Sequence, residues 1–288
     1  MKNKSLLILL FTFLMVTVIT ACTPSVPSIQ YGSIDINSTP DGAKVFINGT
    51  DTGMVTPIIF NKEAGSYTIK LDKFHHKLWE GTVTVNANQT TYINPPLVYA
   101  SLESLTLQPG SEGKDSYVEE KLPETNYGSA NSLWVGHCTA FDADGKYRSY
   151  LQFDLSSIPP NARVVDAHLE LRNYSKMRDD MTVNLLPIGL YRVTDNWLEG
   201  NITWNNQPLS SAQPESIVTI NMNIISDWYS WDIHELLAGW LDGTTANHGV
   251  LFKVVDEIAN AGMLAKFHSS DASEGNLHPK LMIDYYLP

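Results

Sequence analysis

The sequence has only two cysteines in 288 residues, Cys22 and Cys138, which excludes a framework of disulfide bonds. It has no Cys-x-x-Cys pair and no Cys/His cluster with the spacing of a metal site. The Gly-x-Ser-x-Gly elbow, the P-loop and the Gly-x-Gly-x-x-Gly motif are also absent. Acidic side chains outnumber basic ones, 31 to 19, and the resulting net charge of −12 argues against a nucleic-acid partner.

Signs of catalysis are equally scarce. The segment His234–Ala238 begins like the helix of a zinc protease, but Ala238 stands where the second histidine is required. Glycoside hydrolysis needs two carboxylates that face one bond, and nothing in the sequence brings such a pair together. The sequence therefore predicts a protein that is not an enzyme.

The N-terminus carries two lysines followed by the apolar run Leu6–Ile19. This run is shorter than the roughly 20 residues that span a bilayer, so residues 1–21 are predicted to be a secretory signal. The small residues before Cys22 resemble the lipobox of bacterial and archaeal lipoproteins, which implies a lipid attached to Cys22. The alternative is an ordinary signal cut after Ala21. Residues 22–30 then form a flexible tether, and the folded chain is expected outside the cytoplasm, at the cell membrane or outer surface.

Short strands with a period of two fill residues 31–98. Asn48-Gly49 predicts a tight hairpin turn, and Gly65–Leu71 and Thr82–Val85 are two further strands. The expected structure is a small all-β sandwich. The run Pro40–Ala43 (Pro-Asp-Gly-Ala) and the motifs after it resemble the PEGA domain, with aspartate in place of glutamate. This resemblance implies a spacer or interaction module without catalytic activity.

Residues 101–288 contain about ten short strands, which predict a larger two-sheet sandwich of the jelly-roll kind. One short helix is expected after Asp232, with Glu235 completing a capping box. Cys138 follows a strand and is predicted to be a small buried side chain. The whole chain is therefore expected to be all-β, with two modules.

The order of motifs in this second module is similar to the DNRLRE domain, also classed as carbohydrate-binding module family 96. The residues that carry the resemblance include Asn126–Ser129, Arg148–Pro159, Val193–Glu199, Thr203–Pro208, Trp231–Ile233 and Asn247–Val250. The resemblance implies a β-sandwich that recognises polysaccharide, with alginate the ligand type studied in the family. It also leaves a structural calcium ion open, with no ligand set indicated.

Sugar-binding residues are predicted from side-chain chemistry. Hydroxyl groups and carboxylates are bound by side chains that donate hydrogen bonds and sit at strand positions or strand ends. The tryptophans in the family motifs lie beside apolar positions and are predicted to pack in the core; they are Trp197, Trp204, Trp231 and Trp240. The predicted ligand-binding residues are Arg148, His137, Lys266 and His268.

One position departs from the family pattern. The run Phe267–Asp271 has Ser270 where arginine is expected from the resemblance. If that arginine binds uronate in relatives, this chain favours a neutral or otherwise different glycan. A uronate-containing polymer stays open as the ligand.

Together these features predict a non-catalytic, membrane-anchored, extracytoplasmic protein that binds polysaccharide. Two alternatives remain. In the first, both modules make protein contacts as a structural component of the envelope or surface layer. In the second, the chain is a polysaccharide-degrading enzyme.

Overall fold

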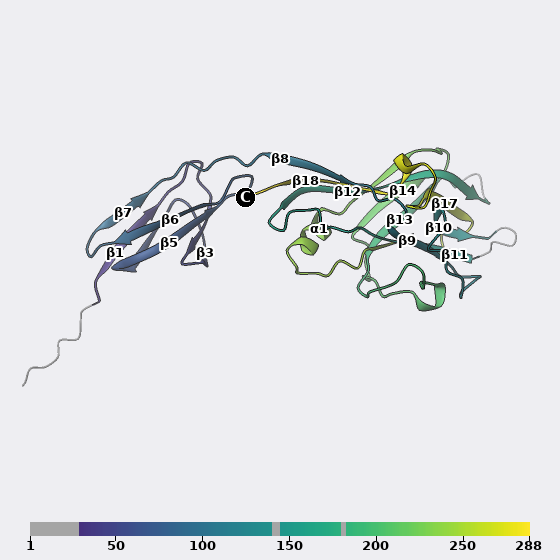
Figure 1. Cartoon of the computed structure of the whole chain (residues 1–288), viewed down its shortest axis with the longest axis horizontal. Coiled ribbons are helices and arrows are strands. Elements are labelled where there is room, and N and C mark those ends of the chain that lie inside the picture. The colour runs from purple at the N-terminus through teal and green to yellow at the C-terminus, as the bar shows by residue number, and fades with distance from the viewer. Residues whose placement is uncertain (1–28, 140–144, 180–182) are drawn as a thin grey trace, which may run out of the picture.

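The computed structural model describes residues 29–139, 145–179 and 183–288. Figure 1 shows two β-rich modules placed end to end along the long axis of the molecule. Cys22, the expected site of lipid attachment, lies outside the described residues, as do the predicted signal and most of the tether. Across the described ranges, no helix combines the length and apolar character needed to cross a membrane.

The first module is a sandwich of two small sheets, ordered β4-β1-β7 and β3-β2-β5-β6. Ile34, Val45 and Ile69 are fully buried between the sheets, as the period of two predicts. Asn48 and Gly49 have φ angles of 51° and 79° in the turn between β2 and β3, which confirms the hairpin. The strands are β1 (Tyr31–Ile36), β2 (Lys44–Ile47), β3 (Thr50–Val55), β4 (Ile58–Glu63), β5 (Gly65–Asp72), β6 (Trp79–Val85) and β7 (Thr90–Ile93).

The second module is one path of hydrogen-bonded strands that folds over on itself. The path runs β14-β13-β16-β11-β10-β17-β12-β18-β8, with β15 paired to β12 and β9 paired to β11. Side chains from its two halves, such as Leu169 and Phe252, meet in one large buried cluster. The strands are β8 (Leu102–Leu107), β9 (Lys114–Glu119), β10 (Ser132–Cys138), β11 (Gly145–Gln152), β12 (Arg163–Arg178), β13 (Leu185–Arg192), β14 (Ser216–Asn221), β15 (Trp228–Asp232), β16 (Val250–Val254), β17 (Met263–His268) and β18 (Lys280–Tyr286). The prediction of an all-β protein with two sandwich modules is confirmed.

Strand β12 organises one face of this sandwich. Its first half pairs with β15 and β18, and its second half pairs with β17. The register shifts between Asn173 and Ser175, where the buried Asn173 side chain donates to the carbonyl groups of Ser175 and Lys266. This bulge contains Tyr174, whose side chain is 36% exposed. The bulge therefore places an aromatic ring on the surface of the sheet.

The helix α1 (His234–Leu241) follows β15, close to the predicted position. Leu236 and Leu237 are buried in the main cluster. The predicted capping box is wrong, because the N-cap residue is Ile233 and no side chain caps the helix. Asp232 accepts a hydrogen bond from the His234 amide at 2.9 Å instead. Because Asp232 accepts directly from the His234 amide, Glu235 is not required as a capping partner, and its side chain is exposed.

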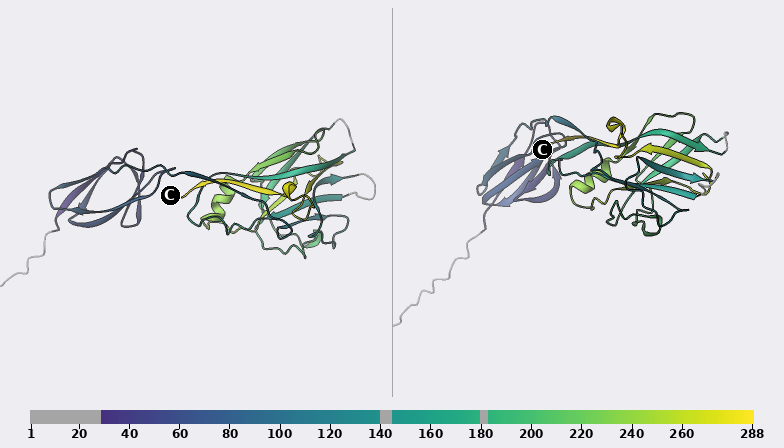
Figure 2. Two further views of the ribbon diagram at one scale, coloured as in Figure 1. Left: turned by 45° about the horizontal axis from the view of Figure 1, so that its top comes forward. Right: turned by 45° about the vertical axis from the view of Figure 1, so that its right-hand side comes forward.

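The two modules meet at a joint between the end of β5 and the ends of β12 and β18. Arg163 donates to both carboxylate oxygens of Asp72, each at 2.6 Å. The rings of Phe74 and His75 pack against Tyr286, which is fully buried, with centroid distances of 5.9 and 5.3 Å. Both views in Figure 2 show the C-terminus at this joint.

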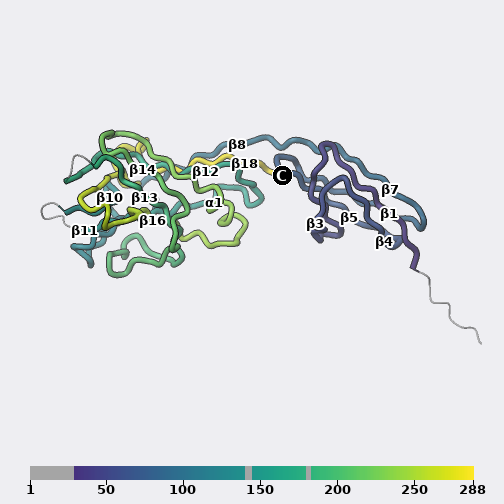
Figure 3. Tube along the Cα trace, turned by 180° about the vertical axis from the view of Figure 1, so that it is seen from behind, coloured from purple at the N-terminus to yellow at the C-terminus, as the bar shows by residue number. Residues whose placement is uncertain are grey.

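Strand β8 carries the chain from the first module into the second. It pairs antiparallel with β18 from Leu102 opposite Tyr286 to Leu107 opposite Leu281. Figure 3 shows β8, β18 and β12 running side by side away from the first module. One face of the second module is thus continuous with the strands that reach the joint.

Candidate functional site

The outer face of β10, β17, β12, β15 and β18 carries aromatic and basic side chains together. Alternation produces this arrangement: in β17, Ala265 and Phe267 are buried in the core, while Lys266 and His268 lie on the opposite side of the strand. The same alternation applies in the neighbouring strands. We call this surface the aromatic–basic strip; its members are Trp134, Tyr174, Trp228, Lys266, His268, Arg172 and Lys280.

At one end of the strip, Lys266 rests on a stack of three rings. Its ammonium nitrogen lies 3.4 Å from the ring centroid of Trp134, the residue opposite it in β10. Trp134 stacks on Tyr117 at 5.3 Å and 7°, and Tyr117 stacks on Tyr127 at 4.1 Å and 18°. Burial lowers the pKa of Lys266. The rings therefore hold a partly desolvated cation in a fixed place.

In the middle of the strip, the rings of His268 and Tyr174 lie 4.9 Å apart at an angle of 50°. Burial is the main cause of a lowered His268 pKa, so this imidazole is largely neutral at neutral pH. A neutral imidazole both donates and accepts hydrogen bonds, as sugar hydroxyl groups do. Tyr174 adds an exposed aromatic face beside it.

At the other end, Trp228 lies beneath two basic side chains. Lys280 Nζ is 4.2 Å from the Trp228 ring centroid and Arg172 Cζ is 5.8 Å away. Lys280 also pairs with Glu170 at 2.9 Å. Among the described residues, no ion pair is formed by Arg172 or by Lys266. The strip therefore presents two uncompensated cations on a protein that is acidic as a whole.

The other two predicted residues lie elsewhere. Arg148 donates to both Glu257 carboxylate oxygens at 2.8 Å and covers the Trp204 ring at 4.6 Å. His137 Nδ1 donates to the backbone carbonyl of Glu257 at 2.7 Å. The structure thus brings Arg148 and His137 together around Glu257, and Lys266 and His268 together on the strip. The four do not form one site.

The predicted core tryptophans pack as expected. Trp231 is fully buried and Trp197 is 5% exposed, while Trp204 and Trp240 are partly buried against the clusters. Cys138 is also buried, in the cluster with Tyr147. Sequence reasoning missed the tryptophans at 134 and 228. Their position one residue away from core positions of the same strand is the signal that could have found them.

Ser270, the position that departs from the family pattern, is in the interior, two positions after the strip residue His268. Ser270 is 1% exposed, and its amide donates to Asp115 Oδ2 at 2.8 Å. Glu199 accepts a hydrogen bond from the Asp115 amide, also at 2.8 Å. Burial raises the pKa of Asp115 to about 7. Because Ser270 is interior, its identity does not determine the charge of a ligand on the strip.

Acidic side chains do not converge on a metal site in the described ranges, where no group of three or more His, Cys, Asp or Glu residues could hold an ion. Asp154 accepts hydrogen bonds from the amide and the hydroxyl group of Ser156 and is exposed. The tight turn at Asp154 leaves the carboxylate at the surface.

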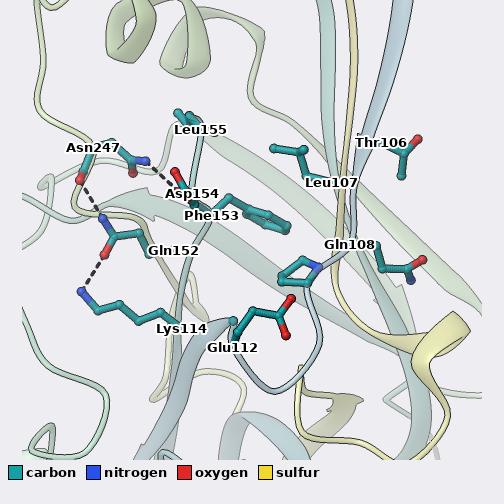
Figure 4. Close-up of a pocket in the computed structure, with 12 residues that line it drawn as sticks. Thr106, Leu107, Gln108, Glu112, Lys114, Gln152, Phe153, Asp154, Leu155 and Asn247 are labelled. Atoms are coloured by element: carbon teal, nitrogen blue, oxygen red, sulfur yellow. Dashed lines mark hydrogen bonds between the residues drawn. The ribbon is translucent and has the colours of Figure 1, made fainter. Parts of the chain in front are cut away.

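A cleft of about 620 Å³ opens at the edge of the sandwich (Figure 4). One wall comes from the end of β8 and the residues after it, and the other from β9 and the end of β11. Lys114, Gln152 and Asn247 form a hydrogen-bonded row on one side, and Gln108 lies on the other. The floor is apolar, with Phe153 and Leu155.

Comparison with known families agrees with this picture. Residues 106–285 match carbohydrate-binding module family 96, which defines the second module as a carbohydrate-binding module. This match covers more than half of the chain, so the protein belongs to carbohydrate-binding module family 96. Residues 31–100 match the PEGA domain. Both are non-catalytic kinds of domain, and no catalytic domain is found.

No curated protein matches the chain significantly. One solved structure that matches is described as "Structural basis for the promiscuous specificity of the carbohydrate-binding modules from the beta-sandwich super family". It is 9% identical, with 86% of this chain and 84% of that chain covered and a TM-score of 0.15. At that score the likeness supports no conclusion.

Proposed function

We propose that this protein is a non-catalytic, lipid-anchored polysaccharide-binding protein that works outside the cytoplasm. The family membership supports carbohydrate binding, and the lipobox-like run before Cys22 supports the anchor. In this arrangement residues 22–30 form the tether, the first module is a spacer, and the second module holds the glycan. Confinement at a surface raises the effective concentration of the binding module near a glycan at that surface, so weak single contacts can together hold the glycan.

The aromatic–basic strip is the proposed binding face, and its ligand is a polysaccharide that carries carboxylates. The observation behind this choice is Lys266, whose ammonium group is seated on Trp134 and has no carboxylate partner in the described part of the chain. A cation held in place loses little side-chain entropy when it pairs with a uronate. His268 and Tyr174 would contact hydroxyl groups and the apolar side of a sugar ring.

The test compares how strongly the wild-type protein and its variants are retained on alginate or pectate. Replacing both free cations of the strip, Lys266→Met with Arg172→Met, is expected to weaken retention roughly a hundredfold or more, the size of two lost charge-assisted contacts. Lys70→Met is the matched control, because Lys70 also rests on a ring, Phe46 at 4.3 Å, but in the first module. Equal retention of the double variant and the control would contradict the proposal that the strip binds the polysaccharide.

The anchor has its own test. Cys22→Ala is expected to move the protein from the membrane fraction to the soluble fraction, and mass spectrometry would show no acyl chains on the variant. A wild-type chain that is found unlipidated would contradict the anchor and leave carbohydrate binding in place.

A structural role in the envelope is the second candidate. The outer face of β4-β1-β7 exposes Ile59 and Tyr92, at 60% and 73%, on either side of Asp35. Exposed apolar side chains of this kind are common at protein contacts. Retention on polysaccharide that free oligosaccharide does not compete away would favour this role. Release of reducing ends or unsaturated uronates would instead indicate a polysaccharide-degrading enzyme.

A further inference from the structure

The cleft at the sandwich edge has the size and lining of a ligand site (Figure 4). Its volume, about 620 Å³, is within the range of small-molecule pockets. Phe153 is buried as part of the core and supports an apolar floor, while polar side chains lie on both walls. A sugar ring has the same division, with apolar C–H faces and a polar rim.

The row on one wall is held in place by its own hydrogen bonds. Lys114 Nζ donates to Gln152 Oε1 at 2.6 Å, and Gln152 Nε2 donates to the Asn247 carbonyl at 2.8 Å. Lys114 Nζ also lies 4.3 Å from the ring centroid of Trp197. An ammonium group has three donors, and within the described residues only one is used by a protein acceptor. Two donors therefore have no protein acceptor in this part of the chain.

Acceptors lie on the opposite wall and at the base. Gln108 Nε2 donates to the carbonyl of His278 at 2.9 Å, which fixes the amide and leaves Oε1 without a protein donor among the described residues. Glu112 accepts the Gly110 amide with one carboxylate oxygen, Oε1, at 3.0 Å. Side chains that donate and side chains that accept hydrogen bonds thus both line the cleft, as a ligand rich in hydroxyl groups requires.

The charges in the cleft distinguish it from the strip. Two carboxylate side chains, Glu112 and Asp154, and one ammonium side chain, Lys114, line the cleft. Hydrogen bonds from the Gly110 amide and from Ser156 lower the pKa values of Glu112 and Asp154, so both are ionised at neutral pH. An anionic sugar would be repelled here, whereas a neutral one would not.

We propose that this cleft is a second saccharide site, separate from the aromatic–basic strip, that takes a neutral sugar unit such as a chain end or a side branch. Its ligand differs in charge from the ligand of the strip. A polymer with carboxylated and neutral units would then be held at two places, which increases the avidity of the single module.

The experiment is calorimetric titration of the full chain with neutral trisaccharides of glucose, mannose, galactose or xylose. Gln108→Met and Lys114→Met keep the side-chain length and remove the unpaired groups, while Lys266→Met on the strip is the control. We expect each cleft variant to weaken neutral-sugar binding roughly tenfold and to leave alginate retention unchanged. We expect Lys266→Met to do the reverse. Thermal melts verify that each variant is folded.

Each other outcome overturns the proposal. Absence of heat with every neutral trisaccharide removes the second site. Weaker neutral-sugar binding in Lys266→Met, with none in the cleft variants, places the sugar on the strip. Equal losses in both sets show that the surfaces act as one site. If the strip is not the binding face for alginate, Lys266→Met will not change alginate retention, and this result is distinct from the outcomes above.

Discussion

Arg163 and Asp72 form a two-point ion pair that joins the two modules, with both N–O distances at 2.6 Å. Arg163 begins β12 and Asp72 ends β5, so the pair links the strand at the centre of the proposed binding face to the sheet β3-β2-β5-β6 of the first module. Such parallel hydrogen bonds fix the direction of the guanidinium plane as well as its position. The modules are therefore held in one orientation.

Breaking this pair is expected to loosen the joint without unfolding either module. Asp72→Asn and Arg163→Gln should each cost about 1 kcal/mol, because Arg163 is about one-third exposed and solvent weakens the attraction. Small-angle scattering should show a broader distribution of module distances in both single variants. The double variant serves as the control, since it should be no worse than either single one. A larger loss in the double variant would show that the two side chains act independently.

The buried carboxyl of Asp115 predicts an unusual dependence of stability on pH. Its pKa is raised from 3.8 to about 7, so the native state binds a proton more tightly than the unfolded state. Its contribution is favourable below pH 4 and is lost as the pH rises from 4 to 7. Asp115→Asn keeps the shape and removes the charge. It should raise the free energy of unfolding at pH 8 by roughly 4 kcal/mol and lose that advantage at pH 4.

Urea melts at both pH values measure this difference. Asp154→Asn is the control, because that carboxylate is exposed and its pKa is lowered by Ser156. A benefit of Asp115→Asn that is equal at both pH values would mean that Asp115 is not the titrating group.

Binding at the strip should depend on salt. If Lys266 and Arg172 pair with uronates, raising NaCl from 0.05 to 0.5 M, values chosen to shorten the Debye length from roughly 14 to 4 Å, should weaken alginate retention. Lys266→Met should reduce that salt dependence as well as the affinity. Retention measured by affinity electrophoresis at several salt concentrations provides the test. A wild-type affinity that is constant across the series would point to hydroxyl contacts alone.

Arg148, in contrast to Lys266, is expected to contribute to stability and not to alginate binding. Its guanidinium is used by Glu257 and Gln207, so Arg148→Gln should leave the mostly buried Glu257 carboxylate without its partner. We expect a loss of about 2 kcal/mol in unfolding free energy and unchanged alginate retention below the melting temperature. Stability close to wild type, together with weaker retention, would instead return Arg148 to the group of ligand-binding residues.

Patterns within one strand were predictable from the sequence, and relations between distant strands were not. Alternation predicted the buried faces, and the motif neighbours of Trp197 and Trp231 indicated that both are in the core. The strip joins Trp134 to Trp228 across strands that are far apart in sequence, and only the registers of β10, β17, β12 and β15 bring them to one face. The bond between Arg148 and Glu257 spans 109 positions and is invisible to local patterns.

The ladder between β8 and β18 also has a mechanical consequence. If the protein is anchored through Cys22 and binds a polymer, as proposed, a flow that drags on the polymer pulls the protein at two points, the tether and the bound ligand. The tension enters the second module through β8 and runs along that strand, whereas its hydrogen bonds to β18 lie across the strand. The ladder is then loaded in shear, with the bonds sharing the force at once instead of opening one by one. The same geometry would let the second module stay folded while it holds a polymer under a steady drag force.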